Sequence, residues 1–163
     1  LPADALMGAE GRAWPLLEKT VDLATVAVAA EQVGGAQQAL DSTVAYLKER
    51  EQFGRVIASY QALKHPAVEI LTAVDAARSF VYHAATLVGG EPLGRDAEIA
   101  CRMAKAQATE ALAYAGDRAV QFHGGMGFTY ECDAQLYRRR ALWCENQHGD
   151  SLYHRRKLAD LIL

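Results

Sequence analysis

The chain has 163 residues, of which 51% are apolar and 23% are charged, and its net charge is −3. A domain of this length buries about 70% of the surface that its unfolded chain exposes, which excludes a need for disulfide or metal staples. The 20 acidic residues outnumber the 17 basic ones, and no apolar run approaches the roughly 18 residues of a membrane span. Nucleic acid and anionic membranes are therefore not expected as partners.

Residues 1–12 predict an irregular lead-in, because Pro2, Gly8 and Gly11 interrupt any helical pattern. This segment lacks an initiating Met and the charged and apolar regions of a signal peptide. We therefore expect the chain to be a piece of a longer protein. A helical domain is predicted over residues 13–163.

One very long helix is predicted from residue 13 to about residue 53. Leu40, Val44 and Leu47 follow helical spacing and would share one buried face. Gly54 then supplies a signal for the end of the helix.

A second helix is predicted after a loop over residues 54–59, with Ser59 as its candidate N-cap. It would be kinked by Pro66 and would end near Gly89-Gly90. Its expected apolar stripe consists of Ile70, Leu71, Val74, Ala77 and Val81.

The remaining segments are also helical in pattern. Residues 95–122 predict a third helix whose many alanines would let neighbouring helices approach closely, and shorter helices follow over about 133–148 and from about Ser151. The chain is therefore predicted to be all-α: an antiparallel up-and-down four-helix bundle with long helices plus a short C-terminal helix.

Two segments could contact a ligand. In "KEREQFG", Arg50 either complements the negative end of the long helix or binds a phosphate, with the ring of Phe53 free to stack on a base. In "QFHGGMG", residues 121–127, three glycines in four positions serve a helix cap and a turn, or let the backbone approach a flat cofactor. Neither segment alone decides between its two interpretations.

The stretch "CENQHGDSLYHRR", residues 144–156, is dense in residues that bind metals or transfer protons. The four possible zinc ligands, Cys132, Cys144, His148 and His154, lack the close first pair of structural zinc sites, so no metal is predicted. The three cysteines of the chain form no CxxC pair, which favours a reducing compartment such as the cytoplasm.

The order of several segments resembles one known family. The run "AAEQVGGAQQALDSTVAYLKEREQFGRVIASYQALKH", then "QFHGGMGF", then a Tyr-Arg-Arg helix are similar to the C-terminal helical domain of the flavin-dependent acyl-CoA dehydrogenases. The resemblance covers the whole chain, and it implies that residues 1–12 are the end of a preceding β-domain. It also implies FAD as cofactor, an acyl-CoA substrate, an electron-transfer acceptor, and a homodimer or homotetramer. It also implies a bacterial cytoplasmic location, or the mitochondrial matrix in a eukaryote.

The resemblance assigns Arg50 to the FAD pyrophosphate. The other contacts that it implies are Phe53 and Gln61 near the adenosine half, and Gln121, Gly124 and Gly125 approaching the FAD of a neighbouring subunit. A phosphate clamp beside a glycine-lined passage suits an extended dinucleotide. The ligand-binding interpretation is therefore favoured for both segments.

The family reaction is α,β-desaturation, in which a carboxylate removes the α-proton while the β-hydrogen leaves as hydride to the flavin. The chain departs from the family at both positions that customarily carry this carboxylate. His148 stands at one of them and Ala24 at the other.

Three explanations of this departure stay open. The base is relocated, to His148 itself, to Glu31 two turns beyond Ala24, or to Glu145 or Asp150 beside His148. Alternatively, the chain is a non-catalytic subunit of a hetero-oligomer whose partner carries the base. In the third explanation it is a related flavin monooxygenase, which needs no such carboxylate.

Overall fold

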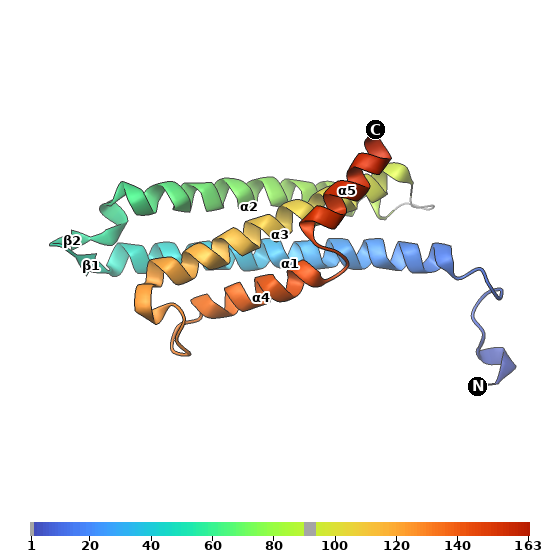
Figure 1. Ribbon diagram of the computed structural model, residues 1–163, viewed down its shortest axis with the longest axis horizontal. Coiled ribbons are helices and arrows are strands. Elements are labelled where there is room, and N and C mark those ends of the chain that lie inside the picture. Colours follow the sequence, from blue (N-terminus) through green and yellow to red (C-terminus); the bar gives the residue numbers. More distant parts are fainter. Residues whose placement is uncertain (1, 90–93) are drawn as a thin grey trace.

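The computed structural model describes residues 2–89 and 94–163 and confirms the all-α bundle (Figure 1). Its helices in these residues are α1 (Trp14–Glu49), α2 (Gln61–Leu87), α3 (Arg95–His123), α4 (Ala134–Asn146) and α5 (Ser151–Ile162). Short 3₁₀ turns occur at Ala3–Ala5, Ile57–Ser59 and Gly124–Met126. The long helices α1 and α2 lie side by side. The short α5 packs against α3, near the N-terminal end of α1.

Helix α3 is the centre of the bundle, since it contacts each of the other four helices. Its alanines at positions 100, 104, 108, 111, 115 and 119 are all buried. Helix α4 crosses α3 at Gly116, where an added Cβ would come within 3.0 Å of the Arg138 Cα atom. The predicted role of small side chains in close helix packing is confirmed at this crossing.

The predicted end of the first long helix is wrong by four residues, because the chain turns into a β-hairpin. Helix α1 ends at Glu49, and strands β1 (Glu51–Gln52) and β2 (Arg55–Val56) pair antiparallel. Phe53 and Gly54 form the turn with φ angles of 54° and 77°, the left-handed pair typical of two-residue hairpins. Gly54 therefore serves the hairpin turn and does not cap the helix.

The predicted start of the second helix is nearly right, but its cap is not. Tyr60, not Ser59, is the N-cap of α2, and the Ser59 hydroxyl instead donates a hydrogen bond to the Val56 carbonyl (2.8 Å). Pro66 lies inside α2, and Gly90, near the predicted end, lies outside the described residues. In the predicted stripe, Leu71 is exposed, whereas the other four members are buried.

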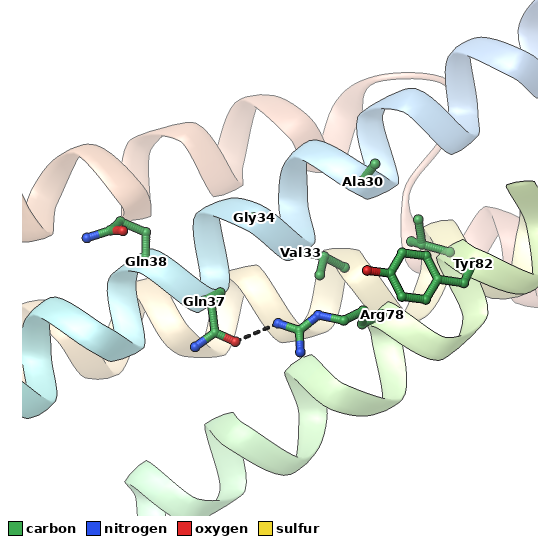
Figure 2. Close-up of a pocket in the computed structure, with 8 residues that line it drawn as sticks. Ala30, Val33, Gly34, Gln37, Gln38, Arg78 and Tyr82 are labelled. Atoms are coloured by element: carbon green, nitrogen blue, oxygen red, sulfur yellow. Dashed lines mark hydrogen bonds between the residues drawn. The ribbon is translucent and has the colours of Figure 1, made fainter.

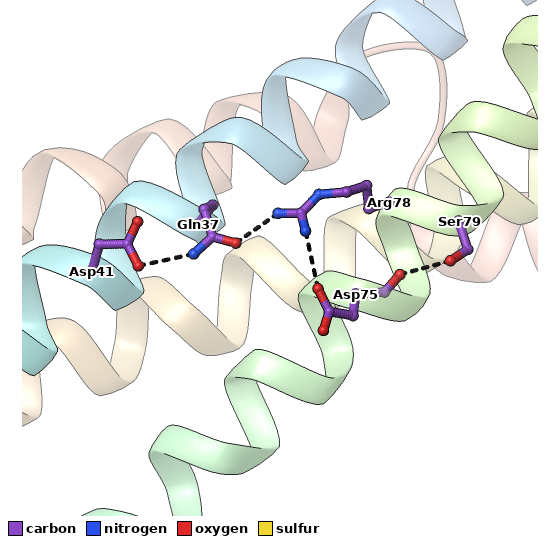
Figure 3. A network of polar contacts seen from close by, with 5 residues as sticks. All are labelled: Gln37, Asp41, Asp75, Arg78 and Ser79. Carbon is purple, nitrogen blue, oxygen red and sulfur yellow. Dashed lines mark hydrogen bonds and ion pairs between the residues drawn. The ribbon is translucent and has the colours of Figure 1, made fainter.

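The seam between α1 and α2 is closed by a polar network (Figure 3). Arg78 donates hydrogen bonds to the Gln37 Oε1 atom (2.6 Å) and to Asp75 (3.0 Å), and Gln37 in turn donates to Asp41 (2.9 Å). The adjacent shallow groove, about 320 Å³ in volume, lies between the two helices and is lined by Val33, Tyr82 and Arg78 among others (Figure 2). The charge of Arg78 is thus satisfied within the chain.

None of the helices in the described residues combines the length and apolar character that crossing a bilayer requires.

Candidate functional site

Two cavities at opposite ends of α1 are lined by some of the residues singled out in the sequence. The first, called here the hairpin cavity, has a volume of about 430 Å³ and is lined by Tyr46, Arg50, Gln52, Ile57, Phe122, His123, Gly124, Gly125 and Met126. The second, called here the α5 cavity, has a volume of about 140 Å³ and is lined by Trp14, Leu17, Glu18, Val21, Asp22, Thr25, Arg102, His148, Tyr153 and His154.

Arg50 is held at the hairpin cavity by its backbone, which leaves its side chain free. It is the C-cap of α1, with its N–H donating to the Tyr46 carbonyl (2.9 Å) and its own carbonyl accepting from the Ile57 N–H (2.8 Å). Within residues 2–89 and 94–163, no carboxylate forms an ion pair with its exposed guanidinium. Unlike Arg78, Arg50 presents an unneutralised charge beside a cavity, which suits an anionic ligand.

The three glycines of residues 124–127 have three different structural roles. Gly124 takes a φ angle of 61° at the end of α3, a conformation that favours glycine. An added Cβ at Gly127 would lie only 2.2 Å from the Val120 carbonyl oxygen, so the fold itself requires this glycine. Gly125 has neither a left-handed φ nor any atom within 4 Å of an added Cβ. The open side of Gly125 is therefore available to a ligand.

Only part of the predicted FAD set lines the hairpin cavity. Arg50, Gly124 and Gly125 do so together, whereas the cavity lining does not include Phe53, Gln61 or Gln121. Phe53 projects from the hairpin tip with 93% of its surface exposed. Because Arg50 and the glycines face one space, a single dinucleotide lying there would meet both.

The sequence interpretation missed an aromatic wall of the hairpin cavity. The rings of Tyr46 and His123 stack with their centroids 4.3 Å apart, and His123 Nδ1 donates a hydrogen bond to the Ala119 carbonyl (2.7 Å). These residues come from the ends of α1 and α3, 77 positions apart in the chain, so no local motif could have indicated the pair. The residues present, a free guanidinium, open glycine backbone and flat rings, fit a dinucleotide such as FAD.

At the α5 cavity, His148 lies on a loop whose backbone is held by hydrogen bonds before and after it. Helix α4 ends at Asn146 rather than at the predicted His148, which has a left-handed φ of 57°. The fully buried Lys105 ammonium donates to the Gly149 carbonyl (2.9 Å), the Glu145 carbonyl (3.4 Å) and Thr109 Oγ1 (3.2 Å). Burial lowers the pKa of Lys105 to about 8, against the opposing effect of nearby acidic groups.

The end of this loop agrees with the sequence prediction. Asp150 is the N-cap of α5, and its carboxylate accepts a hydrogen bond from the Tyr153 N–H (2.7 Å). Gly149 has a φ of 106°, and an added Cβ there would meet the Tyr153 ring at 2.3 Å. The backbone around His148 is thus fixed by Lys105 on one side and by the start of α5 on the other.

Two ionisable groups of the α5 cavity have displaced pKa values. His154 is 2% exposed, and among the described residues neither of its ring nitrogens makes a hydrogen bond of normal geometry, although the backbone at His148 and Gly149 is close enough to oppose the shift of its pKa. Burial, with the charges of Lys105 and Arg102, lowers the pKa of His154 to about 4, so the ring is neutral at neutral pH. Asp22 is 8% exposed, and burial raises the pKa of its carboxyl group, although the Arg102 charge opposes this shift.

Glu31, the predicted alternative base, does not line the α5 cavity. Its carboxylate accepts a hydrogen bond from Arg140 Nε in an ion pair, and a weaker one from Cys144 Sγ (3.8 Å). The hydrogen bond from Arg140 is the largest of the effects that lower the pKa of Glu31. Such a carboxylate is a weaker base than an unpaired one.

In the described part of the chain, no three His, Cys, Asp or Glu side chains are placed to hold a metal ion.

Comparison with known proteins identifies the family. The sequence profile described as "Acyl-CoA dehydrogenase, C-terminal domain" matches residues 11–163. The chain belongs to the acyl-CoA dehydrogenase family. The acyl-CoA dehydrogenase IpdE2 of Mycolicibacterium smegmatis is 42% identical over 120 residues, which are 74% of this chain and 36% of that protein.

Solved structures of related proteins share the fold. A chain of the electron transferring flavoprotein structure from Acidaminococcus fermentans matches with a TM-score of 0.92 and 36% identity, over 100% of this chain and 42% of that one. A chain of the ChsE4-ChsE5 complex from Mycobacterium tuberculosis matches with a TM-score of 0.80 and 28% identity, over 86% of this chain and 37% of that one. The chain thus spans about two-fifths of the proteins that it matches.

Proposed function

We propose that the chain is the C-terminal helical domain of an FAD-dependent acyl-CoA dehydrogenase, which forms a double bond between the α- and β-carbons of an acyl-CoA thioester. The observation that carries this proposal is the hairpin cavity, where the free charge of Arg50 faces the open backbone of Gly124 and Gly125. That combination suits the pyrophosphate of a dinucleotide.

The chain's own residues would bind and orient the cofactor. Arg50 would hold the pyrophosphate with paired N–H donors, and the glycine backbone would allow close approach. The resemblance adds Phe53 and Gln61 at the adenosine half and Gln121 beside the glycines. When bound, the flavin supplies the acceptor for the hydride that leaves the substrate β-carbon.

The partners that we propose follow from this reaction. They are an acyl-CoA substrate, an electron-transfer acceptor that reoxidises the flavin, and further copies of the subunit in a homodimer or homotetramer. The exposed apolar side chains on the outer faces of the bundle, among them Leu71, Val68 and Leu142, support an assembly that covers them. We propose a cytoplasmic location, in keeping with the three free cysteines.

A second candidate function is favoured by one observation, namely that His148 and Ala24 occupy the customary positions of the base. In this alternative, the chain is the non-catalytic subunit of a hetero-oligomeric dehydrogenase and completes an FAD site for a catalytic partner. The ChsE4-ChsE5 complex, which contains a chain of similar fold, is an assembly of two different proteins and supports this arrangement.

The FAD assignment is tested by Arg50→Ala in the full-length protein. Loss of the guanidinium should weaken flavin retention by about tenfold or more, the effect of a lost charged hydrogen bond. Flavin absorbance after gel filtration measures the retained fraction. Arg156→Ala, which removes an exposed arginine on α5, is the matched control and should retain flavin normally. Equal retention in both variants would contradict the pyrophosphate assignment.

A further inference from the structure

One side of helix α1 is left uncovered by the described residues. Helix α1 meets α3 on the side of Gln32, whose side-chain amide donates a hydrogen bond to Thr109 of α3 (3.1 Å). By the helical period, Asp41, Ala45 and Lys48 lie on the opposite side of α1, and all three are exposed. This surface, called here the α1 face, has no covering element within the described part of the chain.

A groove on the α1 face combines apolar and charged side chains. It has a volume of about 590 Å³ and lies between α1 and α2. Leu71 of α2 lines it and is exposed, as is Val68 one helical turn earlier. The full lining consists of Gln37, Leu40, Asp41, Val44, Ala45, Lys48, Glu49 and Leu71. An apolar strip with a charged border is typical of a surface that another protein covers.

The charges of the α1 face are complementary to themselves. Asp41 and Lys48 are two helical turns apart, about 10 Å along the axis, so they share one side of α1. The midpoint of this pair lies between Val44 and Ala45. If a second α1 packs antiparallel with a two-fold axis at this midpoint, Asp41 of each copy meets Lys48 of the other. The small Ala45 side chain at the crossing lets the two helices approach closely.

Both charged groups are available to a second copy. The Gln37 amide donates to one Asp41 oxygen (2.9 Å) and is itself held by Arg78 (2.6 Å), so the carboxylate is fixed in place (Figure 3). Among residues 2–89 and 94–163, no cation forms an ion pair with Asp41, and no carboxylate forms one with Lys48. An antiparallel copy would supply both missing partners.

We propose that the α1 face binds the same face of a second copy of this chain, with the two α1 helices antiparallel and crossing at Val44 and Ala45. This inference rests on the proposed function only in that it specifies one subunit contact of the proposed homo-oligomer. The ion pairs fix the register of the helices, and the apolar strip supplies the buried surface. An axis at Gln38 would instead place Asp41 opposite Gly35 and leave it unpaired.

Charge reversal in the full-length protein tests the pairing. Asp41→Lys or Lys48→Asp alone should raise the dissociation constant of this contact by about tenfold or more, because two attractive pairs become repulsive. The double variant Asp41→Lys/Lys48→Asp should assemble like the wild type. Sedimentation velocity over a range of concentrations measures the dissociation, and thermal unfolding confirms folding. Asp160→Lys and Lys157→Asp, at exposed positions of α5, are the matched controls and should assemble normally.

A cysteine at the crossing tests the position of the axis. The two copies of Ala45 would be offset by only about 1.5 Å along the helices. Ala45→Cys should therefore form a disulfide between subunits on oxidation with diamide, detected as a covalent dimer on a non-reducing gel. Gln38→Cys is the matched control on the same exposed side of α1. Its two copies would lie about 20 Å apart, beyond the reach of a disulfide.

The outcomes separate this contact from the enzymatic function. Unchanged assembly in both single charge variants would overturn the inference, as would a disulfide through Gln38→Cys in place of Ala45→Cys. A wild-type protein that stays monomeric at every concentration would overturn both this contact and the proposed homo-oligomer. Flavin content and reduction by acyl-CoA are recorded separately. A wild type that cross-links through Ala45→Cys but neither binds flavin nor is reduced would support the contact and contradict only the proposed enzymatic function.

Discussion

The two cavities at the ends of α1 are built in opposite ways. The hairpin cavity is open, and its ligand-binding groups are a free guanidinium and bare backbone at helix ends. The α5 cavity is smaller, and its walls include buried ionisable side chains whose pKa values are displaced by burial. The first arrangement suits the binding of a charged, extended ligand, whereas the second keeps a buried histidine ring neutral at neutral pH.

The largest expected effect is on stability, and it concerns Gly127 in the glycine loop of the hairpin cavity. Gly127→Ala should lower the free energy of unfolding by roughly 3 kcal/mol or more, because its Cβ would collide with the Val120 carbonyl. Gly125→Ala should change it by less than about 0.5 kcal/mol and should instead weaken flavin retention. Chemical denaturation and flavin absorbance of the full-length variants measure the two effects.

Two results would contradict these predictions for Gly125 and Gly127. If Gly125→Ala retained flavin as well as the wild type, the open side of Gly125 would not face the cofactor. If Gly127→Ala were as stable as the wild type, the chain would have to shift at Val120, and the loop would be less tightly packed than described.

A somewhat smaller effect is expected at the α5 cavity, where it depends on pH. The pKa of His154 is about 4 in the folded chain, against 6.5 for an ordinary histidine, so the unfolded chain binds more protons between these values. The free energy of unfolding should therefore fall by up to roughly 3 kcal/mol as the pH is lowered from about 6.5 to about 4. His154→Leu removes this contribution and should flatten that part of the stability curve.

Urea unfolding at several pH values, compared between the wild type and His154→Leu, measures this contribution. His65→Leu, at a position where the ring is exposed on α2, is the control and should keep the wild-type pH dependence. Parallel curves for the wild type and His154→Leu would mean that the buried ring finds a hydrogen bond partner and titrates normally.

The same contrast between the two cavities explains which features could be predicted from the sequence alone. The bundle was predictable because its apolar residues follow the helical period, and the Arg50 and glycine segments were recognisable because each is contiguous. The hairpin was missed because its strands are only two residues long, too short for an alternating pattern. The α5 cavity was missed because it joins α1, α3, α5 and the preceding loop, which lie far apart in the chain.

The smallest predicted effect concerns the hairpin tip and separates its conformation from its binding role. Phe53 has a φ of 54°, a strained value for a residue with a Cβ, and its ring makes little contact with the chain. Phe53→Asn should raise the free energy of unfolding by about 0.5 kcal/mol, since Asn tolerates this conformation, yet it should weaken flavin binding by removing the ring. Phe53→Leu keeps the strain and removes the ring, so it should weaken binding without the gain in stability. Flavin titration and thermal unfolding of both variants distinguish these effects. A loss of binding in neither variant would show that the exposed ring has no part in holding the adenosine half, and that the hairpin cavity binds its ligand through Arg50 and the glycine backbone alone.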